Sequence, residues 1–323
     1  MKVTNNSGIS TSLAVWLLAD NYDHINEPNY ISATSLMKPI RHIVLPSRAG
    51  ASTRTPDVED FIARAMGNSL HDSIEKAWVN NYRRSLHLLG YPDDMIEKVL
   101  VNPTDEELAS TPGAIPVYLE QRAFKTIAGY TVGGKFDMVA EGIVHDNKST
   151  SAYTWIYGGR DDEHQLQGSL YRWLNPTKIT EDYIRINYIF TDWRKADARS
   201  NPKYPQKRVE SKEIPLLSVK ETEDWVRWKL AQIQKYSTLP EQEIPECTDE
   251  ELWRSQTVYK YFSDPSKVGG RSTKNFDALA DAKRFQIEKG GKGVIQTVMG
   301  EPKRCGYCDA YDVCSQRKRY FPE

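Results

Sequence analysis

Two aspartates and one lysine near the middle of the chain have the chemistry of a metal-dependent catalytic site. They are Asp137, Asp146 and Lys148. If Glu141 and Gly142 form a two-residue hairpin turn, Asp137 faces Asp146 across the hairpin. Lys148 then shares a face with Asp146, because side chains alternate along a strand. Opposed carboxylates repel each other unless a positive charge lies between them, so the pattern predicts a site for a divalent cation, which prefers oxygen ligands.

The reaction expected at such a site is hydrolysis of a phosphodiester bond. A divalent cation lowers the pKa of a bound water and neutralises charge that develops on the phosphate. Lys148 would hold the attacking water or the scissile phosphate. The alternative is a hairpin face in solvent on which Lys148 screens two ordinary aspartates. A one-residue bulge would also remove the predicted opposition of Asp137 and Asp146.

Two helical motifs flank this hairpin. Upstream, His71 and Glu75 are one helical turn apart, beside an apolar stripe that would face the core. Downstream, Gln167 and Tyr171 have the same spacing, and their amide and phenol groups suit the positioning of a phosphate or a nucleotide. The alternatives are a core or boundary histidine in the first motif and an ordinary helix surface in the second.

Taken in order, these motifs resemble the RecB-type branch of the PD-(D/E)XK nuclease superfamily. That branch includes the nuclease domains of RecB and AddB and many phage-encoded exonucleases. The resemblance covers roughly a third of the chain. It rests on G-x-x-x-H at Gly67 and His71, G-x-x-D at Gly134 and Asp137, D-x-K at Asp146 and Lys148, and Q-x-x-x-Y at Gln167 and Tyr171.

The resemblance implies a Mg²⁺- or Mn²⁺-dependent deoxyribonuclease, more often an exonuclease acting on single-stranded DNA ends in recombination, repair or phage DNA metabolism. A helicase or recombination protein could be its partner. The alternatives are a structure-specific endonuclease or nickase with the same site, and an inactive DNA-binding protein on a nuclease fold. The implied roles are metal ligation by His71, Asp137, Asp146 and the backbone carbonyl of Asn147, catalysis by Asp137, Asp146 and Lys148, and positioning of the DNA strand by Gln167 and Tyr171.

Two neighbouring features are secondary candidates. Glu120, beside Arg122 on the preceding strand, would either support the site or form a cross-strand ion pair. Trp155 and Tyr157 lie between the catalytic lysine and the Gln/Tyr helix. They would stack on the bases of single-stranded DNA, or else pack against the core.

The cysteines predict a second metal site. Cys305, Cys308 and Cys314 follow a C-x₂-C-x₅-C spacing, and Cys247 lies upstream. In a reducing compartment, clustered thiols are typical of metal ligands rather than of disulfides. In AddB-type and CRISPR-associated RecB-like nucleases, a similar C-terminal triplet joins one distant cysteine to hold a [4Fe-4S] cluster, and the resemblance implies such a cluster here. Structural Zn²⁺ is the alternative, and unligated thiols are the third interpretation.

One departure from those families concerns the upstream cysteine. Their lone cysteine precedes the histidine motif, whereas Cys247 follows the catalytic segment. Similar phage-type proteins share a P-x-C-T-x-E-E-x-W segment, which matches Pro245 to Trp253. With either metal, the site would close residues 246–314 into one module.

Composition predicts a globular protein, with 39% hydrophobic residues and a formal net charge of −1. The charge is uneven. Residues 254–323 carry 14 Lys and Arg against 8 Asp and Glu, a balance of +6, whereas the remaining residues carry 29 against 36, a balance of −7. A basic C-terminal part, including Arg317-Lys318-Arg319, could contact a polyanion such as DNA. The alternative is a solvated terminus.

Other functional classes find no support in the sequence. No apolar run approaches the roughly 20 residues of a membrane span, and the N-terminal residues lack the apolar core of a signal peptide. We therefore expect a cytoplasmic protein of a bacterial or phage-infected cell, without a membrane partner. Neither Gly-Gly-Lys segment has the spacing of a P-loop, so no NTPase motor is predicted.

The elements that position these residues predict an α/β fold. We expect a PD-(D/E)XK, restriction-endonuclease-like core with a central mixed β-sheet flanked by helices, and a small Cys-bound C-terminal module. The predicted segments are helices at 10–19, 56–82, 162–174 and 219–236, strands at 117–124, 130–140, 143–148 and 183–193, an irregular stretch at 30–55 and a linker at 238–245. The predicted divisions are an N-terminal segment at 1–55, a nuclease core at 56–240 and a basic four-cysteine module at 241–323.

Overall fold

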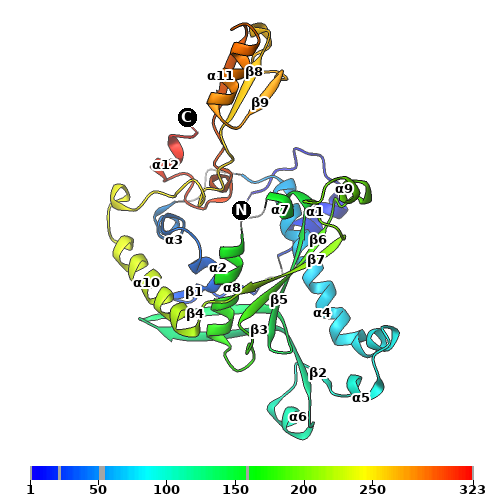
Figure 1. The fold of residues 1–323 in the computed structure, drawn as a ribbon. Coiled ribbons are helices and arrows are strands. Elements are labelled where there is room, and N and C mark those ends of the chain that lie inside the picture. The colour runs from blue at the N-terminus through cyan, green and yellow to red at the C-terminus, as the bar shows by residue number, and fades with distance from the viewer. Residues whose placement is uncertain (1, 21–22, 51–54, 158–159, 322–323) are drawn as a thin grey trace. The chain divides into compact units, whose positions relative to one another are not determined.

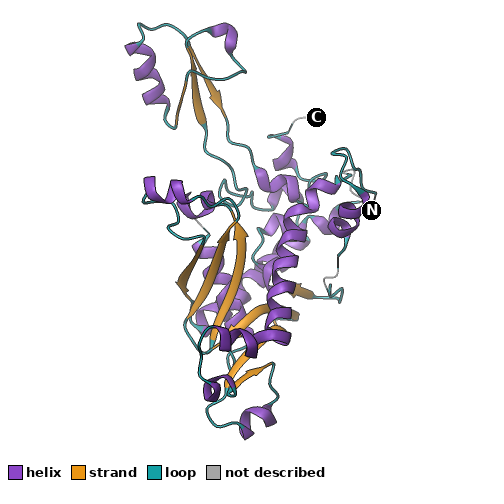
Figure 2. Cartoon of the chain, turned by 90° about the vertical axis from the view of Figure 1, so that its right-hand side faces the viewer, coloured by secondary structure: helices purple, strands orange, loops and turns teal. Residues whose placement is uncertain are grey.

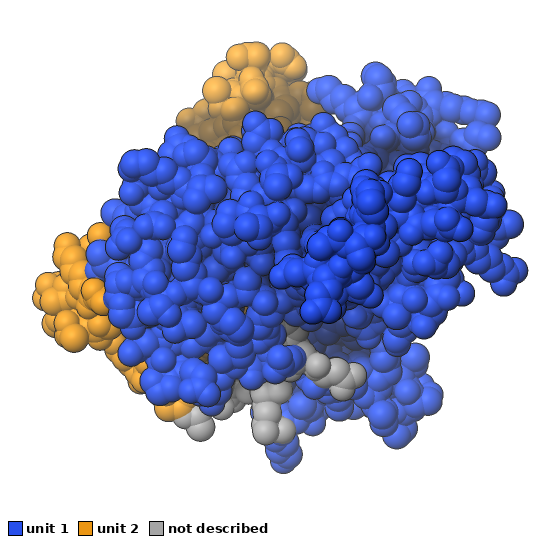
Figure 3. Space-filling view, turned by 90° about the horizontal axis from the view of Figure 1, so that it is seen from below, with its two compact units in different colours: residues 1–38, 54–231 blue, residues 39–53, 232–323 orange. Residues whose placement is uncertain are grey.

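The structure is a computed structural model that describes residues 2–20, 23–50, 55–157 and 160–321 of the 323-residue chain. The chain divides into two compact units, which Figure 3 shows in different colours. Unit 1 comprises Met1–Lys38 and Arg54–Ala231, and unit 2 comprises Pro39–Thr53 and Gln232–Glu323. Residues 39–53, which we assigned to an N-terminal segment, therefore group with the C-terminal residues.

Unit 1 is built on a seven-stranded mixed sheet in the order β2-β3-β4-β5-β6-β7, with β1 paired to β4. The pairs β1–β4, β2–β3 and β5–β6 are parallel, and the others are antiparallel. Burial alternates strictly along β6, as expected for a strand with one polar face. The strands are β1 (Tyr30–Ser32), β2 (Val99–Val101), β3 (Ile115–Ile127), β4 (Tyr130–Ala140), β5 (Ile143–Thr150), β6 (Tyr183–Phe190) and β7 (Val209–Pro215).

Helices cover both faces of this sheet (Figures 1 and 2). On one face, helix α4 (Ile62–Leu88) packs Trp78, Tyr82 and Leu86 against a strand cluster that includes Met138. On the other face, helix α8 (Asp161–Leu174) approaches Ile184 through Gly168. Ile184 pairs with Val144, which pairs with Val139, so these three residues lie on one face of the sheet. Met138 is next to Val139 in the sequence and therefore lies on the opposite face. The predicted α/β class, with a central mixed sheet flanked by helices, is confirmed.

The remaining helical segments complete unit 1. Among the described residues, no helix is both long enough and apolar enough to span a membrane. These segments are α1 (Thr11–Leu18), α2 (Ala33–Leu36), η2 (Val58–Phe61), α5 (Asp93–Ile96), α6 (Asp105–Ser110), α7 (Ala152–Tyr157), α9 (Lys195–Ser200) and α10 (Val219–Ser237), the last of which continues into unit 2.

Unit 2 contains a three-stranded antiparallel sheet in the order β10-β8-β9, with one helix packed on it, and shorter segments around the cysteines. Its core includes Tyr261, Phe262 and Ala282, which are all at most 1% exposed. Its elements are α3 (Ile40–Val44), η1 (Pro46–Arg48), η3 (Glu241–Glu243), β8 (Val258–Phe262), η4 (Pro265–Lys267), β9 (Lys274–Phe276), α11 (Leu279–Glu288), β10 (Val294–Val298), η5 (Lys303–Tyr307) and α12 (Ser315–Lys318).

Several sequence-based element predictions are wrong. The described part of 30–55 is not irregular, because it contains β1, α2, α3 and η1. Strands β2 and β7 were missed; β2 has only three residues, and β7 is an edge strand with mostly exposed, polar residues and no apolar alternation. The strand predicted at 183–193 ends at Phe190, where a turn begins.

The predicted linker at 238–245 is also structured. Arg41, 3% exposed, donates hydrogen bonds to the carbonyl oxygens of Glu241, Ile244 and Pro245 and forms an ion pair with the Glu241 carboxylate at 2.5 Å. Ile244 is buried in the same cluster as Leu45. A buried guanidinium with this many acceptors fixes the segment, so Pro content alone was a misleading signal for a linker.

Candidate metal centre

The hairpin between β4 and β5 has the predicted turn and register. Glu141 and Gly142 have φ values of 53° and 76°, as a two-residue type I′ turn requires. Met138 pairs with His145, Val139 with Val144, and Ala140 with Ile143. The next step of this register places Asp137 opposite Asp146, one residue beyond the paired part of the hairpin.

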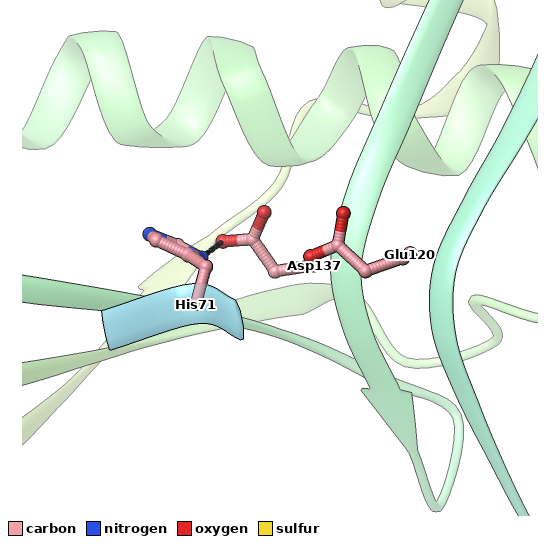
Figure 4. Close-up of side chains that lie close together, drawn as sticks. All are labelled: His71, Glu120 and Asp137. Carbon is pink, nitrogen blue, oxygen red and sulfur yellow. Dashed lines mark ion pairs between the residues drawn. The ribbon is translucent and has the colours of Figure 1, made fainter. Parts of the chain in front are cut away.

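His71 meets Asp137 across the interface between α4 and the sheet (Figure 4). The His71 Nδ1 lies 3.0 Å from the Asp137 Oδ2, and each side chain is 26% exposed. This hydrogen bond raises the pKa of His71 above its ordinary value. Burial raises the pKa of Asp137, and the neighbouring charge of Asp146 adds to this shift. The predicted helix motif and the predicted strand motif therefore meet at one point.

Glu120 joins this pair from β3. The β3–β4 pairs Leu119–Met138 and Gln121–Phe136 place Glu120 opposite Asp137. One ligand atom from each of His71, Glu120 and Asp137 lies within 4.8 Å of the others. Figure 4 shows the two carboxylates side by side, with His71 approaching from the helix.

The backbone at Glu120 is unusual. Its φ is 51°, in the left-handed region that a residue with a side chain rarely adopts, at a cost of about 1–2 kcal/mol. Such strained residues cluster at functional sites. Glu120 also forms an ion pair with Lys135 on β4. Both sequence-based suggestions for Glu120, support of the site and a cross-strand ion pair, are therefore compatible with its position.

Asp146 and Lys148 form the second part of the centre, on β5. The Asp146 side chain is 3% exposed, and its Oδ2 lies 2.9 Å from the Lys148 Nζ. Among the described residues, that oxygen has no hydrogen-bond partner with favourable geometry. Asp146 is outside the 4.8 Å group, but its charge influences the pKa of both His71 and Asp137. The Lys148 ammonium is therefore the positive charge that compensates this buried carboxylate in the structure.

A cleft with a volume of about 440 Å³ opens beside the His71–Asp137 pair, and its described lining residues do not include Asp146 or Lys148. His71, Glu120 and Asp137 line it together with Lys135 and Tyr171. Its polar lining and its size suit a charged substrate better than an apolar one. The remaining lining residues are Trp16, Ala19, Thr34, Ala65, Asn68, Ser69 and Asp72.

Trp16 is a site residue that sequence reasoning missed. It lies on α1, where Leu17 is the buried residue and Leu13, Val15, Trp16 and Leu18 are 37% or more exposed. That excess of exposed apolar side chains on a short helix was the signal that could have indicated a binding surface. An exposed indole beside a polar cleft is suited to stacking on a planar ring.

The other predicted site residues are placed as follows. Tyr171, 6% exposed, lines the cleft, and Gln167 donates its Nε2 to the Tyr171 Oη at 3.2 Å. Gln167 therefore orients Tyr171 instead of lining the cleft itself. The Asn147 side chain accepts a hydrogen bond from Asn187 at 3.0 Å, and Asn147 borders a small pocket that also contains His71.

Of the two interpretations of Trp155, base stacking and packing against the core, the structure supports packing. Its ring packs edge-on against Tyr188 and Phe190, with centroid distances of 5.7 and 5.8 Å. Tyr157 is 67% exposed, with its ring 4.4 Å from that of the equally exposed Tyr153. Trp155 packs in this position because Tyr188 and Phe190 on β6 present their rings to α7.

The arginines of the C-terminal tail have partners within unit 2. Arg317 lies 4.0 Å above the ring of Tyr311, and Arg319 pairs with Glu246 at 2.5 Å. The prediction that this run contacts phosphates gains no support from an arrangement in which both guanidiniums are engaged.

The four cysteines surround one small cavity in unit 2, of about 10 Å³, together with Arg41 and Gln316. Gln316 holds Cys247 beside the C-terminal triplet, because it accepts from the Cys247 N–H at 2.9 Å and donates to its carbonyl at 2.7 Å. Arg41 approaches the Cys314 Sγ at 3.6 Å. Burial raises the pKa of Cys247 to about 12 and that of Cys305 to about 11.

Comparisons with known proteins add little. No family model matches the chain, and no curated protein matches it. Among solved structures, the crystal structure of SSO0001 matches with a TM-score of 0.41 and 16% sequence identity, over 68% of this chain and 84% of that protein. This likeness is too weak to support an inference, so we derive the function from the residues.

Proposed function

We propose that this protein is a metal-dependent DNA nuclease of the RecB-like PD-(D/E)XK type, acting on DNA with a single-stranded end. The observation that carries the proposal is the convergence of His71, Glu120 and Asp137 within 4.8 Å of one another, with Asp146 and Lys148 on the adjacent strand. His71, Glu120, Asp137 and Tyr171 come from separate parts of the sequence and line one cleft, which supports the proposal.

The donor set fits a hard divalent cation such as Mg²⁺ or Mn²⁺. One imidazole and carboxylates from three neighbouring strands supply mainly oxygen ligands. A bound cation would also add to the compensation of the buried Asp146 carboxylate, whose Oδ2 pairs with Lys148 at 2.9 Å but accepts no well-aligned hydrogen bond. His71, Glu120, Asp137 and Asp146 would hold the ion, with the Asn147 carbonyl as a further candidate. When bound, the ion supplies Lewis-acid activation of water and neutralises phosphate charge.

The protein's own groups would bind and orient the substrate. The ammonium of Lys148, which lies 2.9 Å from the Asp146 carboxylate, would bind a phosphate oxygen or orient a water. Tyr171, fixed by Gln167, offers a phenol to the strand in the cleft. Trp16 offers an indole face to a base, and stacking of this kind favours unpaired bases over a closed duplex. This is our reason for proposing a single-stranded end.

We also propose that the four cysteines hold a [4Fe-4S] cluster. Four cysteine side chains around one cavity match the ligand number. Among the described residues, no three of their sulfur atoms lie within 4.8 Å of one another. Thiolates around one Zn²⁺ at about 2.3 Å would be roughly 3.8 Å apart. The wider spacing favours the larger cluster, whose role would be to close unit 2 rather than to catalyse.

The experiment that tests the nuclease proposal compares three DNA substrates. Purified protein is incubated with end-labelled single strands, end-labelled duplexes and closed circles, with Mg²⁺, Mn²⁺ or EDTA. We expect metal-dependent shortening of the single strands and slower or no attack on closed circles. Asp137→Asn is expected to abolish cleavage, whereas Asp182→Asn, at an exposed aspartate of unit 1, should leave it unchanged.

Two results would contradict the proposal. Absence of cleavage with either metal on every substrate, by folded protein, would reject the nuclease function. Rapid cleavage of closed circles would reject the requirement for an end and favour an endonuclease.

A further inference from the structure

Unit 2 contains a small module whose far end is strongly basic. We call residues 258–298 the three-stranded module; it consists of β8, β9, α11 and β10 (Figure 1). It carries eight lysines and arginines against four acidic residues. The chain enters and leaves the module at one end. There Arg254 forms an isolated antiparallel β-bridge with Pro302, and the Ser255 N–H donates a hydrogen bond to the Glu301 carbonyl at 3.3 Å.

The opposite end of the module brings two loops together. Because β8 and β10 are antiparallel and Phe262 pairs with Val294, residues 263–273 and residues 289–293 lie at the same end of the sheet. The Tyr261 hydroxyl donates to the Lys292 carbonyl at 2.9 Å, which fixes the second loop to the sheet. This second loop contains three glycines with φ between 71° and 81°.

Four exposed cations lie on these two loops. We call Lys267, Arg271, Lys289 and Lys292 the basic tip. None of them has an ion pair within the described residues. The acidic residue on these loops, Asp264, uses its carboxylate to accept from the backbone N–H and hydroxyl of Ser266, at 3.0 and 2.8 Å. These hydrogen bonds lower the pKa of Asp264, and the charge of Lys267 adds to this shift, so the two loops carry four cations against one nearby carboxylate.

The open face of the sheet continues this surface. Tyr261 packs on Phe285 of α11, so Lys260, its neighbour, faces away from the helix. The register aligns Gln296, Lys260 and Asn275 in one row across the three strands. In this row the ammonium of Lys260 lies between the side-chain amides of Gln296 and Asn275. Together they offer hydrogen-bond donors and acceptors to phosphates, sugars and base edges.

We propose that the basic tip and this row bind the phosphate backbone of a DNA strand. The inference rests on the proposed function for its choice of DNA as the polyanion. The remaining part of the chain is acidic overall, so the module is the region where the electrostatic attraction of a nucleic acid is concentrated. Binding through lysines and arginines to phosphates is independent of base sequence and weakens steeply with salt.

The test measures binding separately from cleavage. Fluorescence anisotropy of a labelled single-stranded oligonucleotide is measured in EDTA, with the full chain, over a range of salt concentrations. The tip variant is Lys267→Gln, Arg271→Gln, Lys289→Gln and Lys292→Gln together. The matched control is Lys195→Gln, Arg199→Gln, Lys203→Gln and Lys207→Gln, which removes the same charges from exposed positions of unit 1.

We expect the tip variant to bind at least tenfold more weakly than the control variant. The slope of log affinity against log salt should decrease in magnitude by about 2 to 3, since each lost phosphate contact on a single strand contributes about 0.7. Equal affinities and slopes for the two variants would overturn the inference. So would tip-dependent binding to vesicles containing phosphatidylserine without tip-dependent binding to the oligonucleotide.

The outcome is distinguishable from failure of the proposed function. Because binding is measured without metal, wild-type protein that never cleaves DNA could still show tip-dependent binding. Conversely, a nuclease whose DNA affinity is the same in both variants would retain the proposed function and reject this inference.

Discussion

The His71 Nδ1 lies 3.0 Å from the Asp137 Oδ2, and this contact joins the long helix α4 to the central strand β4. Glu120 reaches the same point from β3. The proposed metal centre is thus assembled from a helix and two strands, while Asp146 and Lys148 come from a third strand. A site built on regular elements is held more rigidly than one built on loops.

The role of Glu120 can be separated from its ion pair with Lys135. If Glu120 is a metal ligand, Glu120→Gln should weaken Mn²⁺ binding at least ~tenfold, about 1.4 kcal/mol. Lys135→Met should strengthen it, because the competing cation is removed. Isothermal titration calorimetry of each variant with Mn²⁺ gives both affinities. If neither change alters the affinity, Glu120 serves only the ion pair.

Two helical glycines should respond in opposite ways to substitution by alanine. A Cβ added to Gly67 on α4 meets nothing within 4 Å, so Gly67→Ala should stabilise the protein by about 0.5–1 kcal/mol. A Cβ added to Gly168 on α8 would lie 2.7 Å from Leu216 and 2.9 Å from Ile184, so Gly168→Ala should destabilise it by about 1–3 kcal/mol. Urea unfolding measures both changes. Equal effects would show that the packing of these helices differs from our description.

His164 should make the free energy of unfolding depend on pH. Burial, with a contribution from Lys148, lowers the pKa of His164 from 6.5 to about 4. Between these values the unfolded chain binds a proton that the folded chain does not. The contribution of His164 is therefore complete above pH 6.5 and is lost as the pH falls toward 4. Between pH 7.5 and 5.5 this residue should account for a loss of about 1 kcal/mol.

The comparison variant for this pH effect is His164→Gln. Urea unfolding at both pH values should show that the variant loses about 1 kcal/mol less than the wild type over the interval. An identical loss in the two proteins would mean that His164 is accessible to protons in the folded state.

The cysteine site predicts a coloured protein. Purified without oxygen, the wild type should be brown and contain iron and acid-labile sulfide, whereas Cys247→Ser should lose both. Gln316→Leu leaves the buried N–H of Cys247 without its acceptor, so it should destabilise the protein by about 1–3 kcal/mol and lower the iron content. A colourless wild type with bound zinc would select the alternative metal. Absence of both metals would reject a metal site at the cysteines.

The central part of the fold could be predicted from sequence because its signals are local. The Glu141-Gly142 turn and the apolar alternation on either side fix the β4–β5 register, and that register places Asp137 opposite Asp146. The proximity of Gln167 and Tyr171 was predictable for the same reason, because a helix places residues four apart on one face.

Other parts of the site depend on long-range contacts that no local pattern encodes. Glu120 becomes a candidate ligand because the pairing of β3 with β4 places it opposite Asp137 and α4 brings His71 to the same point. Trp155 had two interpretations from sequence, base stacking or core packing, and only the ring contacts with Tyr188 and Phe190 on β6 distinguish them. The cavity that gathers all four cysteines depends on Arg41 and Gln316, which lie far apart in the sequence.

Cleavage by Asp146→Asn tests the central claim most directly. Initial rates on an end-labelled single strand are measured with Mg²⁺ for the wild type, Asp146→Asn and the control Asp182→Asn, after circular dichroism has shown that all three are folded. We predict equal rates for wild type and control, and a rate at least ~100-fold lower for Asp146→Asn, as for loss of a group that stabilises the transition state. Cleavage by Asp146→Asn at the wild-type rate would contradict the account.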